Sequence, residues 1–360
     1  MTDNKSQITD PGQFIELVNA FRVSRIILSG AELKVFDFLL KPGKHSSELA
    51  TILGTDHRGT DRLLNALVSI GLLVKENDLF LNTPFSDKFL ISSSPAYLSG
   101  LALTNHTWKT WSTLTDAVKM GTSLYFEDPI NERPEEWQQS FIAAMHRRAG
   151  PQAVEVADAL DLTRVKRILD VGGGSGAFTM EFISRNPDMT GVVFDLPKIV
   201  AITEKYIRDE RSAIRDERFA RRDARNENSG SRIADRVSVR SGDYLKDDFG
   251  SGYDLVFMSA IIHINSPEEN ILLIRKGAKA LNPGGQLVIL DHIMSEDRTE
   301  PTVGAIFAIN MLVGTKHGDT YTENELRSWM LDADLKDISV IMTPGGVQLM
   351  RGIKDVRCKT

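Results

Sequence analysis

The sequence predicts an α/β protein in which a domain of alternating strands and helices follows a mostly helical domain with the outline of a winged helix. Residues 167–197, which read RILDVGGGSGAFTMEFISRNPDMTGVVFDLP, have the pattern of a buried strand, a glycine-rich turn, a helix and a second strand. Earlier in the chain, residues 46–81 have the order helix, helix and hairpin. The length of 360 residues also favours two domains over one.

The glycine-rich turn is the first candidate for a ligand site. Glycines let the chain bend sharply and bring its backbone against a ligand, and Gly172 and Gly174 stand at the start of this bend. We expect Ser175 and Thr179 to open the helix that follows. Asp195 ends the second strand, where a carboxylate can accept hydrogen bonds from both hydroxyls of a ribose.

The spacing of the glycines bears on the class of nucleotide. A dinucleotide fingerprint has the form G-x-G-x-x-G, but counting from Gly172 the last position holds Ala177, and the spacing here is G-x-G-x-G. This spacing favours a ligand without a pyrophosphate. Some dinucleotide folds tolerate alanine at that position, so a dinucleotide stays open as an alternative. A tight turn that binds no nucleotide is the other alternative.

The N-terminal winged-helix pattern raises the question of DNA binding. Residues 45–54 and 56–73 have the pattern of two helices, and residues 72–82 that of two short strands joined by a turn. Residues 14–88 contain as many Lys and Arg as Asp and Glu, which leaves no basic face for phosphate groups. The sequence therefore favours a dimerisation module and predicts no nucleic-acid partner.

Composition indicates the compartment. The net charge is -6, and the single cysteine, Cys358, excludes a disulfide framework and fits a reducing cytosol. The first residues, MTDNKSQITDPGQ, lack the layout of a signal peptide, and no apolar run approaches the roughly 18 residues that span a bilayer. We expect a cytoplasmic protein with no membrane partner.

Several motifs together resemble one enzyme family. DVGGGSG and FDLP are followed by SGDYLKD at 241–247, YDLVFMSAIIHI at 253–264, LNPGGQLVILD at 281–291 and YTENELRSWM at 321–330. In order and spacing they resemble the plant and bacterial small-molecule O-methyltransferases that use S-adenosylmethionine. The resemblance implies a homodimer in which residues 1–96 form a winged-helix dimerisation domain and residues 97–150 a helical linker that walls the substrate cavity. Residues 151–360 would form a Rossmann-like, seven-stranded methyltransferase domain that binds S-adenosylmethionine.

The resemblance also assigns the cofactor contacts. Asp243 would accept a hydrogen bond from the adenine amino group and Tyr244 would cover a face of the base, although a loop cap after Gly242 is an alternative role for Asp243. Ser259 stands where plant members often have a lysine, so any contact there is altered. The full set of expected cofactor residues is Gly172, Gly174, Asp195, Leu196, Gly242, Asp243, Tyr244 and Ser259.

His263 matches the position of the family's catalytic base. It precedes a helix that should open with a capping box of Ser266 and Glu269. A phenol has a pKa near 10 and a histidine one near 6.5, so an imidazole suits the removal of the phenol proton during methyl transfer. Asp291 would orient that imidazole, whereas the family's second acidic position falls on Thr320. No metal is expected.

The acceptor is predicted only as a hydroxylated small molecule, aromatic or polyketide-like. Ordinary helix packing is the alternative role for the expected contacts within residues 97–150 and for Met311. Two alternative functions stay open: methylation of carbon or nitrogen, or another reaction, by a relative of the same fold, and a winged-helix regulator that senses the methyl donor. The expected acceptor contacts are Trp108, Met145, His146, Asn310 and Met311.

One segment departs from the family. Residues 207–213, 214–220 and 221–227 are three successive heptads, IRDERSA, IRDERFA and RRDARNE, and relatives would bridge this interval with a shorter connection. Dense charges of mixed sign allow pairing along an exposed helix. We therefore expect residues 207–228 to form an inserted solvated helix, with a partner-binding arm as the alternative.

Overall fold

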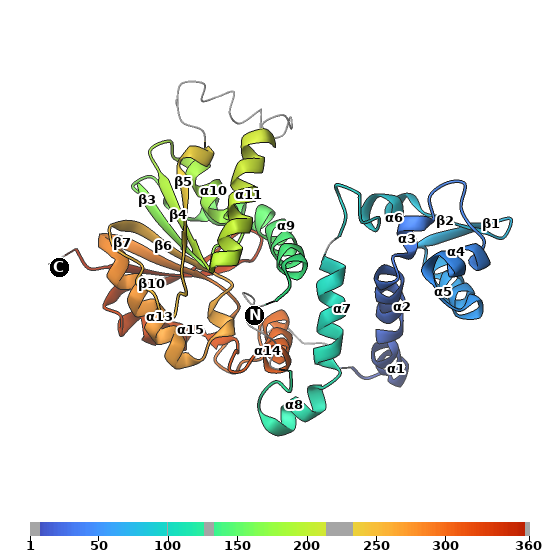
Figure 1. Cartoon of the computed structure of the whole chain (residues 1–360). Helices are drawn as coiled ribbons and strands as arrows, with labels where there is room; N and C mark the ends of the chain where they lie inside the picture. The colour runs from blue at the N-terminus through green and yellow to red at the C-terminus, as the bar shows by residue number, and fades with distance from the viewer. Residues whose placement is uncertain (1–7, 99, 126–132, 214–232, 357–360) are drawn as a thin grey trace. The chain divides into compact units, whose positions relative to one another are not determined.

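The computed structural model describes residues 8–98, 100–125, 133–213 and 233–356, shown in Figure 1. The chain divides into two compact units, Met1–Trp108 and Lys109–Thr360. Within the described ranges, no helix has both the length and the apolar character needed to cross a membrane. The predicted domain boundaries at 96/97 and 150/151 stay predictions.

The N-terminal unit has the predicted order of two helices and a hairpin. Asp56 caps the second of these helices by accepting a 2.9 Å hydrogen bond from the amide of Gly59. The hairpin strands pair antiparallel, and Asn77 and Asp78 at its turn have φ of 50° and 65°, as a tight hairpin turn requires. The elements are α1 (Pro11–Asn19), α2 (Phe21–Glu32), α3 (Val35–Phe38), α4 (Ser46–Leu53), α5 (His57–Ser69), β1 (Leu73–Glu76), β2 (Leu79–Asn82) and α6 (Pro84–Phe89). Helix α7 (Gly100–Trp111) begins in this unit and ends in the second, which starts at Lys109.

The second unit is built on a seven-stranded sheet in the order β10-β11-β7-β6-β3-β4-β5. Strands β7, β6, β3, β4 and β5 are parallel, and β11 is antiparallel to both of its neighbours. The predicted Rossmann-like fold class, with its preceding mostly helical unit, is confirmed. The strands are β3 (Arg167–Val171), β4 (Thr190–Asp195), β5 (Val237–Ser241), β6 (Tyr253–Ser259), β7 (Leu281–Leu290), β10 (Leu335–Met342) and β11 (Gln348–Lys354).

The order of the strands places the ligand site. The chain runs from β3 outward through β4 to β5, and then returns to the other side of β3 with β6 and β7. In open parallel sheets, the crevice at such a reversal lies at the carboxyl ends of the strands and binds ligands. The loops after β3, β4, β5, β6 and β7 therefore meet at one edge of the sheet.

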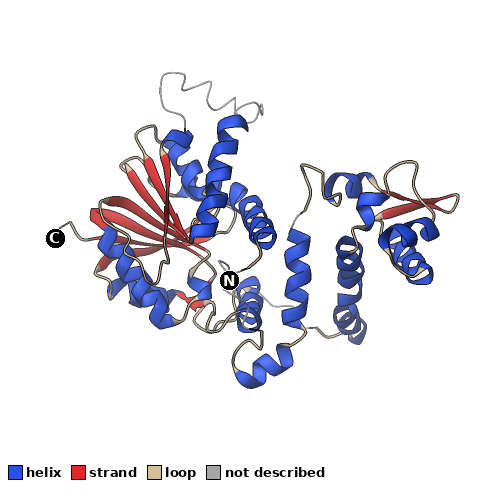
Figure 2. Cartoon of the chain, in the orientation of Figure 1, coloured by secondary structure: helices blue, strands red, loops and turns tan. Residues whose placement is uncertain are grey.

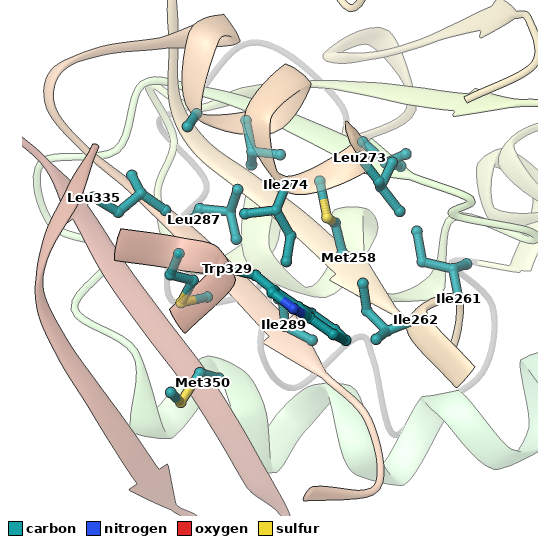
Figure 3. Close-up of a cluster of buried hydrophobic side chains, with 14 of the residues drawn as sticks. Met258, Ile261, Ile262, Leu273, Ile274, Leu287, Ile289, Trp329, Leu335 and Met350 are labelled. Atoms are coloured by element: carbon teal, nitrogen blue, oxygen red, sulfur yellow. The ribbon is translucent and has the colours of Figure 1, made fainter. Parts of the chain in front are cut away.

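Helices cover both faces of this sheet, as Figure 2 shows. Alternate strand residues divide between two cores: Leu169 and Val171 pack in the cluster with α13 and α15, and Ile168 in the cluster with α9 and α10. Figure 3 shows the first cluster around Trp329. The helices are α8 (Leu114–Met120), α9 (Glu135–Ala159), α10 (Ala177–Arg185), α11 (Pro197–Ala213), α13 (Pro267–Ala280), α14 (Thr302–Gly314) and α15 (Glu323–Leu331), with short turns η1 (Ile233–Asp235) and η2 (Ile262–Ile264) and the strand pair β8 (Ile293–Met294) and β9 (Tyr321–Thr322).

The helix openings test two predictions. Ser266 and Glu269 form the predicted capping box of α13. The prediction that Ser175 and Thr179 open α10 is wrong, because the N-cap is Gly176 with φ of 77° and no side-chain cap bond. Thr179 is fully buried and bonds inward, and Ser175 bonds to another helix, so neither hydroxyl is available to cap α10.

The inserted heptads are described only at their start. Helix α11 continues to Ala213, and Ile207 on it is buried against Met180 and Ala234. The rest of the predicted insertion lies outside the described residues. The two predictions for it, a solvated helix and a partner-binding arm, are therefore untested.

Candidate active site

The glycine-rich turn after β3 needs glycine for its backbone. Gly172, Gly174 and Gly176 have φ of 68°, 55° and 77°, a region that other residues rarely adopt. Gly172 also lacks room for a side chain, because a Cβ there would lie 2.6 Å from Cγ2 of Ile261. The turn therefore lies directly against the loop that follows β6.

Asp195 is held against this turn. One oxygen of its carboxylate accepts a 2.8 Å hydrogen bond from the amide of Gly174, and the other accepts a 2.7 Å bond from the amide of Leu196. Burial raises the pKa of Asp195 to about 6, although both amide bonds act to lower it. Leu196 packs beside Ile142 of α9. The carboxylate predicted to bind a ribose thus stands beside the glycine-rich turn.

A second buried carboxylate, Asp170, was missed by the sequence analysis. It interrupts the apolar run of β3, and that interruption was the available signal. Its side chain accepts a 2.7 Å hydrogen bond from the hydroxyl of Thr179, while its other oxygen has no partner among the described residues. Burial raises its pKa to about 7, with a contribution from the charge of Asp195.

The loop after β5 carries the residues predicted to contact adenine. Gly242 packs tightly on Phe194, since a Cβ would lie 2.4 Å from its ring. Asp243 accepts a 2.9 Å bond from the amide of Leu245, which is the alternative role as a loop cap, and also pairs with Lys246. Tyr244 is half-buried, and burial raises the pKa of its hydroxyl.

The predicted base and its orienter are in contact. Nδ1 of His263 lies 2.8 and 3.0 Å from the two carboxylate oxygens of Asp291, which directly follows β7. The amides of His263 and His292 also donate to this carboxylate. Burial acts to raise the pKa of Asp291, but the charge and hydrogen bonds of its histidine neighbours outweigh burial and lower it. Because an ionised carboxylate only accepts, Nδ1 donates, and in the neutral form of the ring the lone pair is on Nε2.

Buried amides hold the turn that carries His263. Asn265 donates to the carbonyl of Ile261 at 3.1 Å, and Asn270 donates to the carbonyl of Ile262 at 2.9 Å. The oxygen of the Asn265 amide accepts a 3.0 Å bond from the hydroxyl of Tyr244. One buried side chain therefore joins the loop after β5 to the histidine turn, a link that the sequence analysis missed.

Helix α14 forms one side of the histidine site. The ring of Phe307 lies 4.8 Å from that of His263, edge to face, and 4.5 Å from that of His292. Asn310 and Met311, predicted to border the acceptor, lie one turn further along this helix. The side-chain amide oxygen of Asn310 accepts a 2.9 Å hydrogen bond from the indole N–H of Trp111. Met311 is buried, which agrees with either acceptor contact or core packing.

The other expected acceptor contacts are Trp108, Met145 and His146, and their roles stay predictions. Nδ1 of His146 lies 2.8 Å from the hydroxyl of Ser175, and its ring lies 4.4 Å from that of Tyr206, so it adjoins the glycine-rich turn. Met145 is half-buried on the same helix, α9. The ring of Trp108 lies 6.4 Å from that of Phe21, within the N-terminal unit.

Two remaining predicted positions lie at strand ends. Ser259 is half-buried at the end of β6 and pairs with Leu290 of β7. Thr320 is buried directly before β9, so no carboxylate stands at the position of the family's second acidic residue.

Two models of known protein families match this chain, one in each unit. Residues 15–92 match the model of the O-methyltransferase dimerisation domain, and residues 111–228 and 220–334 match that of the O-methyltransferase domain. The chain belongs to this O-methyltransferase family. The predicted enzyme class and cofactor are thus confirmed: the chain is an S-adenosylmethionine-dependent O-methyltransferase. The two matches to the second model overlap over 220–228, inside the predicted insertion.

The similarity to individual relatives covers nearly the whole chain. Acetylserotonin O-methyltransferase of Gallus gallus is 30% identical over 359 residues, covering 95% of this chain and 96% of that protein. The 3-hydroxy-5-methyl-1-naphthoate 3-O-methyltransferase of Streptomyces sahachiroi is 27% identical, covering 96% and 95%. The crystal structure of human N-acetylserotonin methyltransferase in complex with S-adenosylmethionine has a TM-score of 0.75 at 23% identity and covers 98% of this chain and 99% of that chain, which shows the shared fold.

Proposed function

We propose that this enzyme methylates a hydroxyl group of an aromatic or polyketide-like small molecule, with His263 as general base and Asp291 as the residue that orients it. The observation that carries the proposal is the contact of 2.8 and 3.0 Å between Nδ1 of His263 and the carboxylate of Asp291. The names of the naphthoate and acetylserotonin relatives, which denote aromatic acceptors, support the substrate class.

The residues at the sheet edge fit the methyl donor. Bound S-adenosylmethionine supplies a sulfonium methyl group, whose carbon bonds to the acceptor oxygen while the electron pair of the broken carbon–sulfur bond stays on sulfur. Because Gly172 and Gly174 have no side chains, the backbone of the turn can approach such a ligand closely, and Asp195 offers a carboxylate for ribose hydroxyls. Tyr244 and Asp243 would hold the adenine, and Leu196, Gly242 and Ser259 complete the proposed donor contacts.

His263 would take up the proton that the acceptor hydroxyl loses. Nδ1 donates to Asp291, so Nε2 is the nitrogen that accepts this proton. The carboxylate of Asp291 then stabilises the imidazolium that forms, and it holds the ring in one orientation. General base catalysis of this kind contributes roughly 100- to 10,000-fold to the rate.

Replacement of His263 tests the proposal. We expect H263A to lower kcat by roughly 100- to 10,000-fold while calorimetry finds nearly unchanged affinity for S-adenosylmethionine. H317A is the matched control, because His317 is exposed, and it should keep full activity. A fully active H263A variant would refute the role of the base, and a variant that no longer binds the donor would point to a structural role.

We also propose a homodimer. The N-terminal unit matches a dimerisation domain, and α1 has no buried residue in the single chain. Its apolar residues are largely exposed, among them Phe14 at 55%, Ile15 at 58% and Leu17 at 62%. Apolar faces of this kind are typical of interfaces between copies. Light scattering of the wild type and of F14E would test this proposal, since the charge should shift the mass toward that of one chain.

A further inference from the structure

The hydrogen bond between Trp111 and Asn310 fixes the orientation of the Asn310 side chain. The bond spans 199 residues of sequence and has a length of 2.9 Å. An indole N–H can only donate, so the atom that faces Trp111 must be the amide oxygen. The usual uncertainty between the oxygen and nitrogen of an asparagine side chain therefore does not arise here. The two N–H groups of Asn310 must point away from Trp111.

Asn310 lies one helical turn from Phe307, a residue that contacts the proposed base. It follows Phe307 by three residues on α14, and residues at this spacing are neighbours on one side of a helix. The ring of Phe307 lies 4.8 Å from that of His263. Close to the C-terminal end of α14, the hydroxyl of Ser123 donates a 2.7 Å hydrogen bond to the backbone carbonyl of Val313. The position of Asn310 is thus set by packing on both sides.

The nitrogen of the Asn310 amide donates to no group in the described part of the chain. Within the described part of the chain, only the oxygen of this amide has a hydrogen-bond partner. The side chain is half-buried, and the neighbouring Phe307 and Met311 offer no acceptor oxygen from their side chains. A ligand that leaves these N–H groups unpaired while it excludes water loses binding free energy.

We propose that Trp111 and Asn310 form a specificity pair that selects acceptors with a carbonyl oxygen near the methylated hydroxyl. This inference rests on the proposed function and narrows its substrate class. A carbonyl oxygen only accepts hydrogen bonds, and Asn310, with its own oxygen turned toward Trp111, presents its two N–H donors to a ligand. An acceptor with a methylene group in place of the carbonyl cannot form this bond.

Matched pairs of acceptors test the proposal. The positional isomers of hydroxy-1-tetralone carry a carbonyl where the corresponding tetrahydronaphthols carry a methylene group. For each pair we would measure the ratio of kcat/KM, ketone over methylene, in the wild type and in the variants N310D and W111F. The carbonyl also changes the acidity of the phenol, but this effect is common to all enzymes and cancels when their ratios are compared.

For at least one isomer, we expect the wild-type ratio to exceed that of N310D by roughly 2- to 13-fold, the range for one neutral hydrogen bond. W111F removes only the indole N–H and should lower the ratio toward that of N310D, because the freed amide can turn its oxygen to the ligand. N324D is the matched control: Asn324 is exposed on α15, and the same change of amide to carboxylate there should leave the ratio unchanged.

Binding measurements separate this inference from the proposed function. Dissociation constants of each pair, measured by calorimetry with S-adenosylhomocysteine present, should give the same preference without any methyl transfer. Absence of turnover with a retained ketone preference would therefore overturn only the proposed function. Equal ratios in the wild type, N310D and W111F, or no ketone preference in any pair, would overturn the specificity pair.

Discussion

Replacement of Asp291 by Asn measures how far the carboxylate acts through the imidazole. Asn keeps the shape of Asp291 and one acceptor oxygen for Nδ1 of His263, but it removes the charge beside the imidazolium. The loss is the difference between a charged and a neutral hydrogen bond, about 1 to 1.5 kcal/mol, or roughly 5- to 13-fold in kcat. The environment supports such a loss, because only 12% of the imidazole and 4% of the carboxylate are exposed.

Single-turnover and steady-state rates with labelled donor would be measured for D291N, H263A and the double variant. If Asp291 acts only through His263, its replacement should change kcat of the H263A enzyme by no more than about twofold. Both oxygens of Asp291 accept from N–H groups, so Asn also places its own NH2 group against a donor. Melting temperatures and donor affinity therefore accompany the rates. If D291N lowered kcat by the same factor in the wild-type enzyme and in the H263A enzyme, the role assigned to Asp291 would be contradicted.

Two further predictions concern the donor site. G172A should weaken S-adenosylmethionine binding and lower the melting temperature more than G284A, because both glycines have positive φ but only Gly172 has an atom of Ile261 within 2.6 Å of a new Cβ. Equal losses in the two variants would contradict this argument. Burial raises the pKa of Asp195 to about 6, so donor affinity should rise between about pH 5 and 7 as the carboxylate ionises and can accept both ribose hydroxyls. D195N should bind weakly at every pH in calorimetry, and a wild-type affinity independent of pH would contradict the assignment.

The sequence predicted the sheet and the meeting of His263 with Asp291 for one physical reason. Parallel strands carry their carboxyl ends to one edge, so residues that follow β6 and β7 must come together there. Buried strands can also be recognised in a sequence as apolar runs bounded by glycine. The contact of 2.8 Å between these two side chains required only the correct identification of the strands.

The contacts between helices were not predictable in the same way. Helical periodicity shows which residues share a face, but not which partner that face meets. His146 stays a predicted acceptor contact, but its 2.8 Å contact with Ser175 of the glycine-rich turn was not anticipated. The pairing of Trp111 with Asn310 depends on how the chain before α8 packs against α14, which no local pattern indicates. The capping prediction for α10 was wrong because the hydroxyl of Thr179 donates to the buried Asp170 and does not cap the helix.

The small cluster of Ile207, Met180 and Ala234 bears on how this family tolerates changes of length. Ile207 is the first residue of the predicted insertion and Ala234 follows its last residue, so their packing holds the two ends of this stretch together. When the two ends of a loop are held together in this way, doubling the length of the loop lowers the free energy of unfolding by only about 0.6 kcal/mol through closure entropy. Duplicated heptads could therefore accumulate between these points while strand β5 kept its register beside β4.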